Sequence, residues 1–318
     1  MNSHLHEEVE HIANCFELAI LLEVSANKPG NINLMVGFED TRYEHFLASA
    51  VAASASFEQA AERGIMVSEG TLGVGDVEVG QLIKRCVEDV AKWQHGGNTL
   101  LGTVILLMPM AVAAGITCRD KEHIFKLPEL REKLKLVVES TSASDAVHVY
   151  EAIKAANPSG LGKASELDVN DPKSTRRILE EEISLYRVFE VASEYDNICS
   201  EWVKNYPLTF DVAYPYLTEQ IKMGKSLDAA IIHTFLKVLG DYSDTFISRK
   251  VGAEKSKQVS LEAKRVLQQG GVETPDGKKC LSEFDLKLRS EGNLLNPGTT
   301  ADIVSAALAL FVLGGYRP

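Results

Sequence analysis

The amino-acid sequence predicts an all-α protein. Apolar residues recur at helical spacing along most of the chain, and no segment shows the strict alternation that is typical of a half-buried strand. Breaks that contain glycine or proline separate these apolar segments, and there is no internal repeat. With 318 residues, 45% of them hydrophobic, the chain is long enough to bury a sizeable core. We therefore expect a single, bundle-like helical domain over residues 1–318.

Six helices are expected in the first half of the chain. The Lys28-Pro29-Gly30-Asn31 segment ends the first helix, and Gly64 is expected to end the alanine-rich second one. Asn98-Thr99 is expected to cap a very apolar helix, which we place at the centre of the core. A long turn-rich loop follows the sixth helix. The six ranges are 9–24, 43–63, 81–94, 100–114, 127–140 and 143–156.

The second half is expected to be helical as well. A long charged segment is followed by two further helices, and a polar amphipathic helix then ends at Gly270-Gly271. Asn296-Pro297-Gly298 opens a final apolar helix. If neighbouring helices are antiparallel, several of the glycine-containing breaks should converge at one end of the bundle. The six ranges are 173–206, 210–223, 229–239, 253–269, 281–291 and 301–313.

Charge and cysteine content exclude several classes of protein. The formal net charge is −12, whereas nucleic acids and anionic membranes select basic surfaces. The five cysteines are widely spaced, without a CxxC motif or Cys/His ligand spacing, so we expect neither a disulfide framework nor a zinc site. The first ten residues do not form a signal peptide, and no apolar run is a convincing membrane span. We expect a cytoplasmic protein that binds a small molecule.

The stretch from Gly240 to Gly252 concentrates charge directly after an apolar helix. On one continuous helix, Asp241, Asp244 and Ser248 would share a face, with Arg249 and Lys250 beside it. Charges near a core are tolerated when they are paired, bound to metal or exposed to a wet cleft. The stretch is therefore either a functional site or a solvated helix end with an Asp–Arg pair.

Three other stretches carry polar groups at helix ends. Glu23 is followed by Lys28 and Asn31, which would offer a carboxylate and a cation. Asn98-Thr99 and the Asn296–Asp302 stretch each open an apolar helix, where backbone N–H groups attract anions. Ordinary capping explains each stretch equally well when it is taken alone.

The order of these landmarks resembles the triphosphoribosyl-dephospho-coenzyme A synthase family, and most of all its archaeal branch. The resemblance extends from Glu23 to Leu313. Its K-P-G and N-P-G motifs are moderately specific singly and strongly specific for the family in combination. The matching segments are Glu23-Val24, Lys28-Pro29-Gly30-Asn31, Asn98-Thr99 with Gly102, Asp244-Thr245 with Arg249 and Gly252, Gly270-Gly271, and Leu295-Asn296-Pro297-Gly298 with Asp302.

The resemblance implies a transferase that uses ATP as a ribosyl donor. In the family, the ribose 2′-hydroxyl of 3′-dephospho-CoA attacks the anomeric carbon of ATP, adenine leaves, and the triphosphate stays on the product. A carboxylate near the anomeric carbon suits an oxocarbenium-like transition state, and Mg²⁺ suits the triphosphate.

The resemblance also suggests a role for each candidate residue. Asp241 and Asp244 are expected to bind the metal or act as base, and Glu23 is a third catalytic candidate. Phosphate is expected to bind to cations and to backbone groups at helix starts, while Asp302 holds a ribose hydroxyl or the metal. The expected nucleotide- and phosphate-binding residues are Lys28, Asn31, Asn98, Thr99, Arg249, Lys250, Asn296, Gly298 and Asp302.

Two departures from the family pattern concern the substrate. Where N-T-H-K-G is expected, the chain has Leu100 and Leu101 in place of the histidine and the lysine. Where D-T-N and R-G-G are expected, it has Phe246 and then Lys250-Val251. Lys250 could supply the missing cation, but the identity of the acceptor is left open.

Three functions therefore compete. The leading hypothesis is transfer of a triphosphoribosyl group from ATP. The same fold could instead use another acceptor, or water, as an N-glycoside hydrolase does, or it could be a nucleotide sensor or interaction scaffold without catalysis. Small-residue faces around 48–55 and 301–310 would permit a homodimer, but they would serve an ordinary core equally well.

Overall fold

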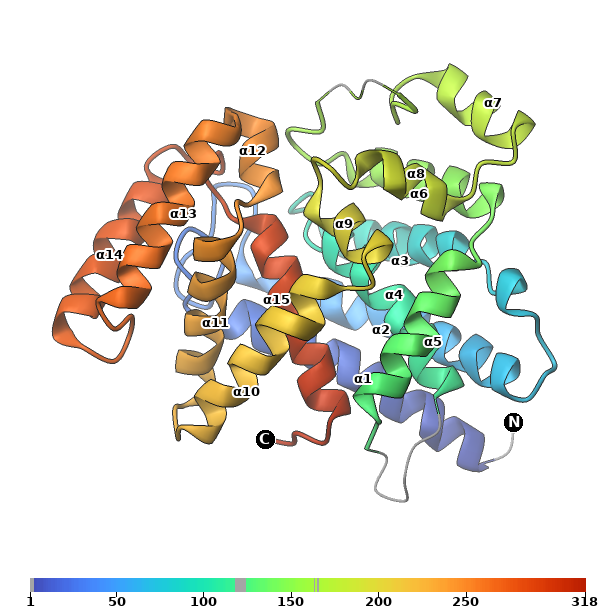
Figure 1. The fold of residues 1–318 in the computed structure, drawn as a ribbon, viewed down its shortest axis with the longest axis horizontal. Helices are drawn as coiled ribbons and strands as arrows, with labels where there is room; N and C mark the ends of the chain where they lie inside the picture. Colours follow the sequence, from blue (N-terminus) through green and yellow to red (C-terminus); the bar gives the residue numbers. More distant parts are fainter. Residues whose placement is uncertain (1–2, 118–123, 163, 165) are drawn as a thin grey trace.

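The computed structural model describes residues 3–117, 124–162, 164 and 166–318, and it confirms the all-α class (Figure 1). Over these residues the chain forms fifteen α-helices, a 3₁₀ turn and a π-helical segment, and no β-strand. The bounds are α1 Ser3–Ser25, α2 Tyr43–Ser68, η1 Val74–Asp76, α3 Val79–Trp93, α4 Leu101–Ile116, α5 Leu127–Glu139, α6 Ala143–Ala156, α7 Pro172–Glu180, α8 Leu185–Ala192, α9 Asn197–Val203, η2 Leu208–Ala213, α10 Tyr214–Lys222, α11 Leu227–Asp241, α12 Thr245–Val251, α13 Ala253–Gln268, α14 Pro275–Arg289 and α15 Gly298–Leu313.

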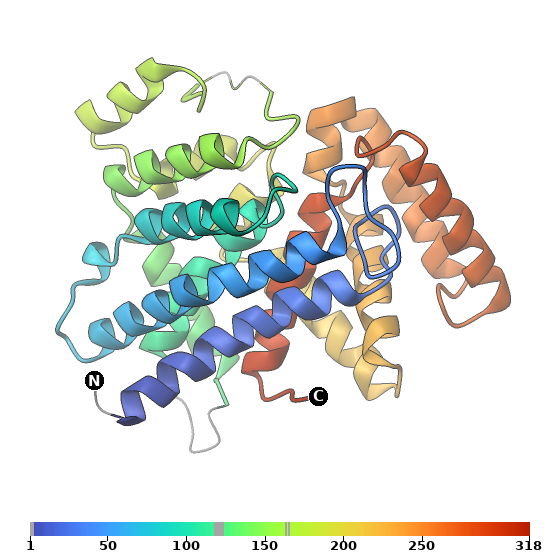
Figure 2. The ribbon, with the colours of Figure 1, turned by 180° about the vertical axis from the view of Figure 1, so that it is seen from behind.

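Two apolar helices, α4 and α15, occupy the centre of the molecule. α15 packs against α1, α4, α10 and α11, and nearly all of its residues are buried. Seen from behind, α1 and α2 run alongside each other, with α2 packed on α4 and α1 packed on α15 (Figure 2). The described residues contain one continuous cluster of buried apolar side chains. The single domain stays a prediction.

Gly64 does not end α2, contrary to our expectation. The helix continues to Ser68, and Gly64 packs against the backbone of α4 at Val112 and Gly115. A β-carbon on Gly64 would collide with the carbonyl oxygen of Val112. The glycine therefore serves close helix packing, which outweighs its low helix propensity.

The segment 173–206 is also not one helical run. It is divided into α7, α8 and α9, because Ser184 and Asp196 cap new helices with their side chains. The residue Glu182 adopts a left-handed conformation between the first two of these helices. The segment expected as a helix over 210–223 begins instead as the π-helical η2 and continues as α10. Side-chain caps thus start new helices within a segment whose composition favours one continuous helix.

The Gly240–Gly252 stretch is broken as well. α11 ends at Asp241, and Asp244 is the N-cap of a new helix, α12, so the two aspartates do not share a helix face. The helix expected over 281–291 starts earlier, at Pro275, with Thr274 as its cap. Proline at the first helical position explains this earlier start.

A proline inside α4 determines how α9 is attached to the core. Pro109 has no N–H, so the carbonyl of Ile105 lacks the partner that a helix normally provides. The indole Nε1 of Trp202 donates to this carbonyl at 3.1 Å. The hydroxyl of Tyr206 donates to the next carbonyl, that of Leu106, also at 3.1 Å. Buried carbonyl groups of α4 thus fix the end of α9.

No helix in the described ranges is long and apolar enough to span a membrane. The thiols of Cys15, Cys86, Cys199 and Cys280 are free, and the remaining cysteine, Cys118, lies outside the described residues.

The Trp202–Ile105 bond predicts a rescue experiment. Trp202→Phe should lower the free energy of unfolding by about 1–3 kcal/mol, because it leaves a buried carbonyl unpaired. In a Pro109→Ala background the new N–H of residue 109 can bond that carbonyl, so the effect of Trp202→Phe should shrink by about 1 kcal/mol. Urea denaturation of the four proteins measures the coupling. Additive effects would contradict the assigned role of Pro109.

Candidate active site

Several of the glycine-containing breaks converge on one cavity of about 710 Å³, whereas neither the Gly70–Gly80 segment nor Gly270-Gly271 lines it. Its lining comes from the end of α1 and the loop after it, the loop before α4, the loop after α6, and the starts of α12 and α15, together with α8 and α9. Eight of the predicted site residues line it. They are Glu23, Asn31, Asn98, Thr99, Arg249, Asn296, Gly298 and Asp302.

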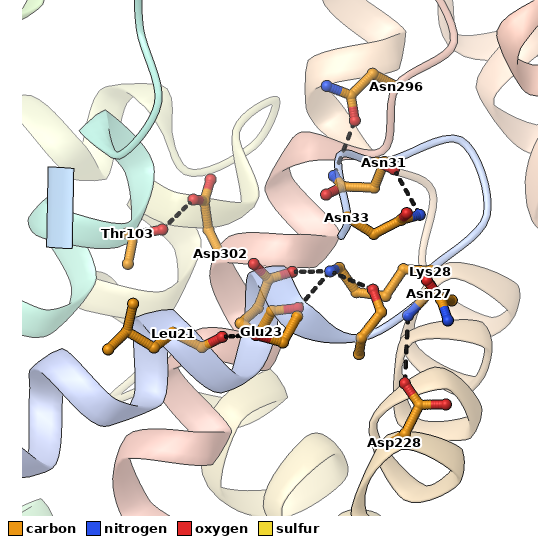
Figure 3. A network of polar contacts seen from close by, with 12 residues as sticks. Leu21, Glu23, Asn27, Lys28, Asn31, Asn33, Thr103, Asp228, Asn296 and Asp302 are labelled. Atoms are coloured by element: carbon orange, nitrogen blue, oxygen red, sulfur yellow. Dashed lines mark hydrogen bonds and ion pairs between the residues drawn. The ribbon is translucent and has the colours of Figure 1, made fainter. Parts of the chain in front are cut away.

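The two motifs that lie farthest apart in the sequence meet at this cavity. The Nδ2 of Asn31 donates to the Oδ1 of Asn296 at 2.9 Å (Figure 3). Arg289 of α14 fixes the same loop by donating to the carbonyl oxygen of Asn31 at 2.6 Å. The loop after α1 is thereby tied to the start of α15.

Glu23 is buried beside Lys28 at the end of α1. Its Oε1 lies 3.1 Å from the Nζ of Lys28, but the geometry is that of an ion pair without a hydrogen bond. The same Nζ donates to the carbonyl oxygens of Glu23 and Ala26. Burial raises the pKa of Glu23 and lowers that of Lys28, while their attraction opposes both shifts. The ammonium group is therefore engaged behind Glu23, and Lys28 is not among the residues that line the cavity.

Asp302 lies opposite Glu23, near the start of α15 and just beyond its first turn (Figure 3). Its Oδ1 accepts a hydrogen bond of 2.6 Å from the hydroxyl of Thr103 on α4. The other oxygen, Oδ2, lies against Gly102, where a β-carbon would collide with it. Burial raises the pKa of Asp302 to about 8, the Thr103 hydrogen bond opposes this, and the negative charge of Glu23 adds to it. The glycine of the N-T-x-x-G pattern thus makes room for the carboxylate.

The start of α4 is held by its two polar residues. The Oδ1 of Asn98 accepts from the backbone N–H of Leu101 at 3.1 Å, but the N-cap of α4 is Leu100 and not Asn98 or Thr99, contrary to our expectation. Thr99 shares a hydrogen bond of 2.7 Å with the hydroxyl of Ser49 on α2.

Arg249 faces the cavity and forms an ion pair with Asp196, the N-cap of α9. The Nε of Arg249 is buried without a hydrogen-bond partner among the described groups. Asp196 was not among the predicted site residues. Locally, the sequence shows only that Asp196 could cap a helix, and its Oδ1 does accept a hydrogen bond of 2.8 Å from the backbone N–H of Ile198. The pairing could not be predicted, because Asp196 and Arg249 lie far apart in the sequence.

Asp244 is buried and saturated with hydrogen bonds. Its Oδ1 accepts from the N–H of Ile247 at 3.0 Å, and its Oδ2 accepts from the N–H and the hydroxyl of Thr300 at 2.7 and 2.8 Å. Burial raises its pKa, and these hydrogen bonds oppose the rise. Asp244 therefore joins the first turns of α12 and α15, and it is not among the cavity-lining residues.

Asp241 and Lys250 also lie outside the lining. Asp241 forms ion pairs with Lys237 at 2.6 Å and Lys264 at 3.4 Å on the outer side of α11. Lys250 donates to the carbonyl of Asn293, and its Nζ lies 3.8 Å from the centre of the Phe246 ring. Burial lowers the pKa of Lys250 to about 8. The predicted metal pair of Asp241 and Asp244 is therefore not formed. The break between α11 and α12 places the two carboxylates against different partners.

A family model for ATP:dephospho-CoA triphosphoribosyl transferase matches residues 9–317. The chain belongs to this transferase family. A protein from Malonomonas rubra is 25% identical over 218 residues, which cover 69% of this chain and 60% of that protein. One from Citrobacter koseri is 28% identical over 99 residues, or 31% and 32% of the two chains. Both bear the name "Probable 2-(5''-triphosphoribosyl)-3'-dephosphocoenzyme-A synthase". The alignments thus span three fifths of the first relative and one third of the second.

A solved structure titled "Crystal structure of putative triphosphoribosyl-dephospho-coA synthase from Archaeoglobus fulgidus" has the same fold. The TM-score is 0.61 at 21% identity, over 85% of this chain and all of that one. Within this transferase family fold, Leu101 lines the cavity beside Gly102, whereas Leu100 belongs to the buried core. Leu101 thus gives the cavity an apolar side chain where the sequence resemblance led us to expect a polar one.

The two aspartates of the Gly240–Gly252 stretch should respond differently to substitution. Asp244→Ala leaves two buried N–H groups and a hydroxyl without their acceptor, so we expect a loss of about 3 kcal/mol in the free energy of unfolding. Asp241→Ala removes only exposed ion pairs and should change it by less than about 1 kcal/mol. Chemical denaturation followed by circular dichroism tests the contrast. Equal effects would mean that Asp244 does not join the two helices.

Asp302 should make stability depend on pH. The unfolded chain releases this proton near pH 4, whereas the folded chain keeps it until about pH 8. The folded state binds more protons across this window, so the contribution of Asp302 to the free energy of unfolding falls as pH rises through it. Asp302→Asn should therefore gain stability relative to wild type from about pH 5 to about pH 8, and the gain should level off above. Parallel pH profiles in urea denaturation would contradict this.

Proposed function

We propose that the protein transfers the triphosphoribosyl group of ATP to the hydroxyl of a small acceptor, with release of adenine. The family's acceptor, 3′-dephospho-CoA, is the first candidate. The observation that carries the proposal is the pair of carboxylates, Glu23 and Asp302, which face the same cavity between the starts of two core helices. Membership of the transferase family supports the reaction class.

The triphosphate fits the side of the cavity formed by α4 and α15. Both helices begin at the cavity, so their N-terminal backbone groups and dipoles favour anions. Arg249 lines the same cavity, and its Nε has no hydrogen-bond partner among the described groups. A guanidinium can bind phosphate through two N–H groups. The amide of Asn296 and the backbone of Gly298 are further contacts within the lining.

The carboxylates suit the chemical step. Loss of adenine from the anomeric carbon builds positive charge on the ribose, which a nearby carboxylate stabilises. The acceptor hydroxyl must lose a proton when its oxygen bonds to that carbon. Burial raises the pKa of Asp302 to about 8, so the ionised fraction that can act as general base should increase as pH rises toward 8. We therefore assign proton transfer to Asp302 and charge stabilisation to Glu23.

One carboxylate of this pair, Glu23, would hold Mg²⁺ together with the substrate phosphates, which leaves Asp302 to accept the proton. Among the described residues no three His, Cys, Asp or Glu side chains form a metal cluster. Mg²⁺ in nucleotide enzymes, however, commonly uses one or two carboxylates together with substrate phosphates. The Oε1 of Glu23 is paired with Lys28, whereas no described hydrogen bond reaches its Oε2, which is the oxygen that could serve as a ligand. When bound, the ion would neutralise charge on the triphosphate.

Adenine release from ATP with Mg²⁺ and 3′-dephospho-CoA tests the proposal. Asp302→Asn and Glu23→Gln should each lower the rate by about two to four orders of magnitude, as expected for loss of acid–base or electrostatic catalysis. Asp241→Ala is the matched control, because it removes a carboxylate outside the cavity, and its rate should be unchanged. If Asp241→Ala abolishes turnover while Asp302→Asn does not, the assignment is wrong.

The assay also separates the rival functions. Adenine formed at the same rate without any acceptor would indicate an N-glycoside hydrolase. ATP binding in calorimetry without adenine formation would indicate a nucleotide sensor, and absence of both would refute the nucleotide site.

We further propose a cytoplasmic location, which the free thiols of the described cysteines support. The homodimer stays a prediction. Ser49, Ala50 and Ala53 of the first small-residue face are buried within the chain, and so is most of 301–310. Those faces therefore serve the core of the chain itself.

A further inference from the structure

One end of the cavity carries aromatic side chains that are not buried by the core. Phe38 of the loop after α1 and Phe46 near the start of α2 are half-buried, and His95 of the loop before α4 is exposed. Neither phenylalanine ring stacks on another described aromatic ring. By contrast, Tyr150 and Phe189 of the opposite wall are both only 4% exposed. Aromatic rings with an open face suit a flat ligand such as a nucleobase.

Phe46 is held between the end of α1 and the start of α4. One turn before it, the hydroxyl of Tyr43 shares a hydrogen bond of 3.1 Å with that of Ser25 at the end of α1. One turn after it, the hydroxyl of Ser49 is bonded to that of Thr99 at the start of α4. The two cavity carboxylates lie against these same helix ends. The Phe46 ring therefore adjoins the proposed reaction centre.

The turn that contains Phe38 is fixed in place and carries a free carboxylate. The N–H of Phe38 donates to the carbonyl of Thr41 at 2.8 Å, and the Thr41 hydroxyl donates to the carbonyl of Gly96 at 2.6 Å. The guanidinium of Arg289 lies 5.6 Å from the centre of the Phe38 ring. Asp40 lines the cavity from this turn, and its carboxylate has no hydrogen bond or ion pair with any described residue. The turn thus presents an aromatic ring together with an unused acceptor.

We propose that the adenine ring of ATP binds against Phe38 and Phe46, and that Asp40 accepts a hydrogen bond from its 6-amino group. This inference rests on the proposed function for the identity of the nucleotide. N9 of adenine is bonded to C1′, so a ribose with C1′ between Glu23 and Asp302 holds the base next to Phe46. Stacking on aromatic rings favours any base, whereas the carboxylate favours a base with a donor at position 6.

Calorimetric titration with Mg²⁺ and ATP tests the stacking. Phe46→Leu should weaken ATP binding roughly tenfold, and it should leave the binding of inorganic tripolyphosphate, which has no base, within about twofold of wild type. Phe210→Leu is the matched control, because this half-buried ring of η2 lies outside the cavity, and it should change neither affinity. Unchanged ATP binding by Phe46→Leu, or an equal loss of both ligands, would overturn the inference.

Purine riboside 5′-triphosphate tests the role of Asp40, because it differs from ATP only in lacking the 6-amino group. Wild type should bind ATP roughly three- to tenfold more tightly than this analogue. Asp40→Ala should remove the preference. Glu39→Gln changes the neighbouring exposed carboxylate, which does not line the cavity, and should keep the preference. The same preference in wild type and Asp40→Ala would contradict the assigned contact.

These titrations and the adenine-release assay separate the base site from the proposed function. If adenine is released but neither Phe46→Leu nor Asp40→Ala behaves as expected, the base site is wrong and the proposed function stands. If both variants behave as expected but no adenine is released, the base site stands and the proposed transfer fails. Absence of ATP binding to wild type would overturn both.

Discussion

The structure depends on a buried carboxylate that joins two helix starts. Asp244 accepts hydrogen bonds from the first turns of α12 and α15, and its own backbone carbonyl accepts one of 2.8 Å from Ser256 of α13. A buried charge is tolerated only when its partners are in place, so these three helices must pack in one arrangement. That arrangement directs Arg249 of α12 and Asp302 of α15 toward the same cavity. The residue that we expected to perform chemistry instead positions those that line the site.

The remaining buried charges follow the same rule. Lys28 uses its donors on Glu23 and on the turn that follows α1, and Asp196 caps α9 while it pairs with Arg249. Each of these contacts fixes a helix end, and the cavity forms where those ends meet. Glu23 and Asp302 differ from the others, because no described hydrogen bond reaches the Oε2 of Glu23 or the Oδ2 of Asp302. They are the carboxylates best placed to act on a ligand.

Local patterns in the sequence were sufficient to predict the fold class and most helices. Amphipathic spacing identified α1, α3 and α6, and the K-P-G-N and N-P-G segments identified two edges of the cavity. The failures occurred where tertiary packing reverses a local preference. Gly64 lies inside a helix because α4 approaches it closely, and a single cap at Asp244 breaks a segment that otherwise has helical spacing. The Asp196–Arg249 pair could not be predicted, since nothing local connects residues so far apart.

The central claim is that the nucleotide site lies between Glu23 and Asp302 and not along the Gly240–Gly252 stretch. A crystal structure with Mn²⁺ and formycin 5′-triphosphate, whose carbon–carbon glycosidic bond does not break, tests it directly. The account predicts an anomalous Mn²⁺ signal between Glu23 and Asp302, with the triphosphate at the starts of α4 and α15. A metal ion bound at Asp241, or a triphosphate outside this cavity, would contradict it.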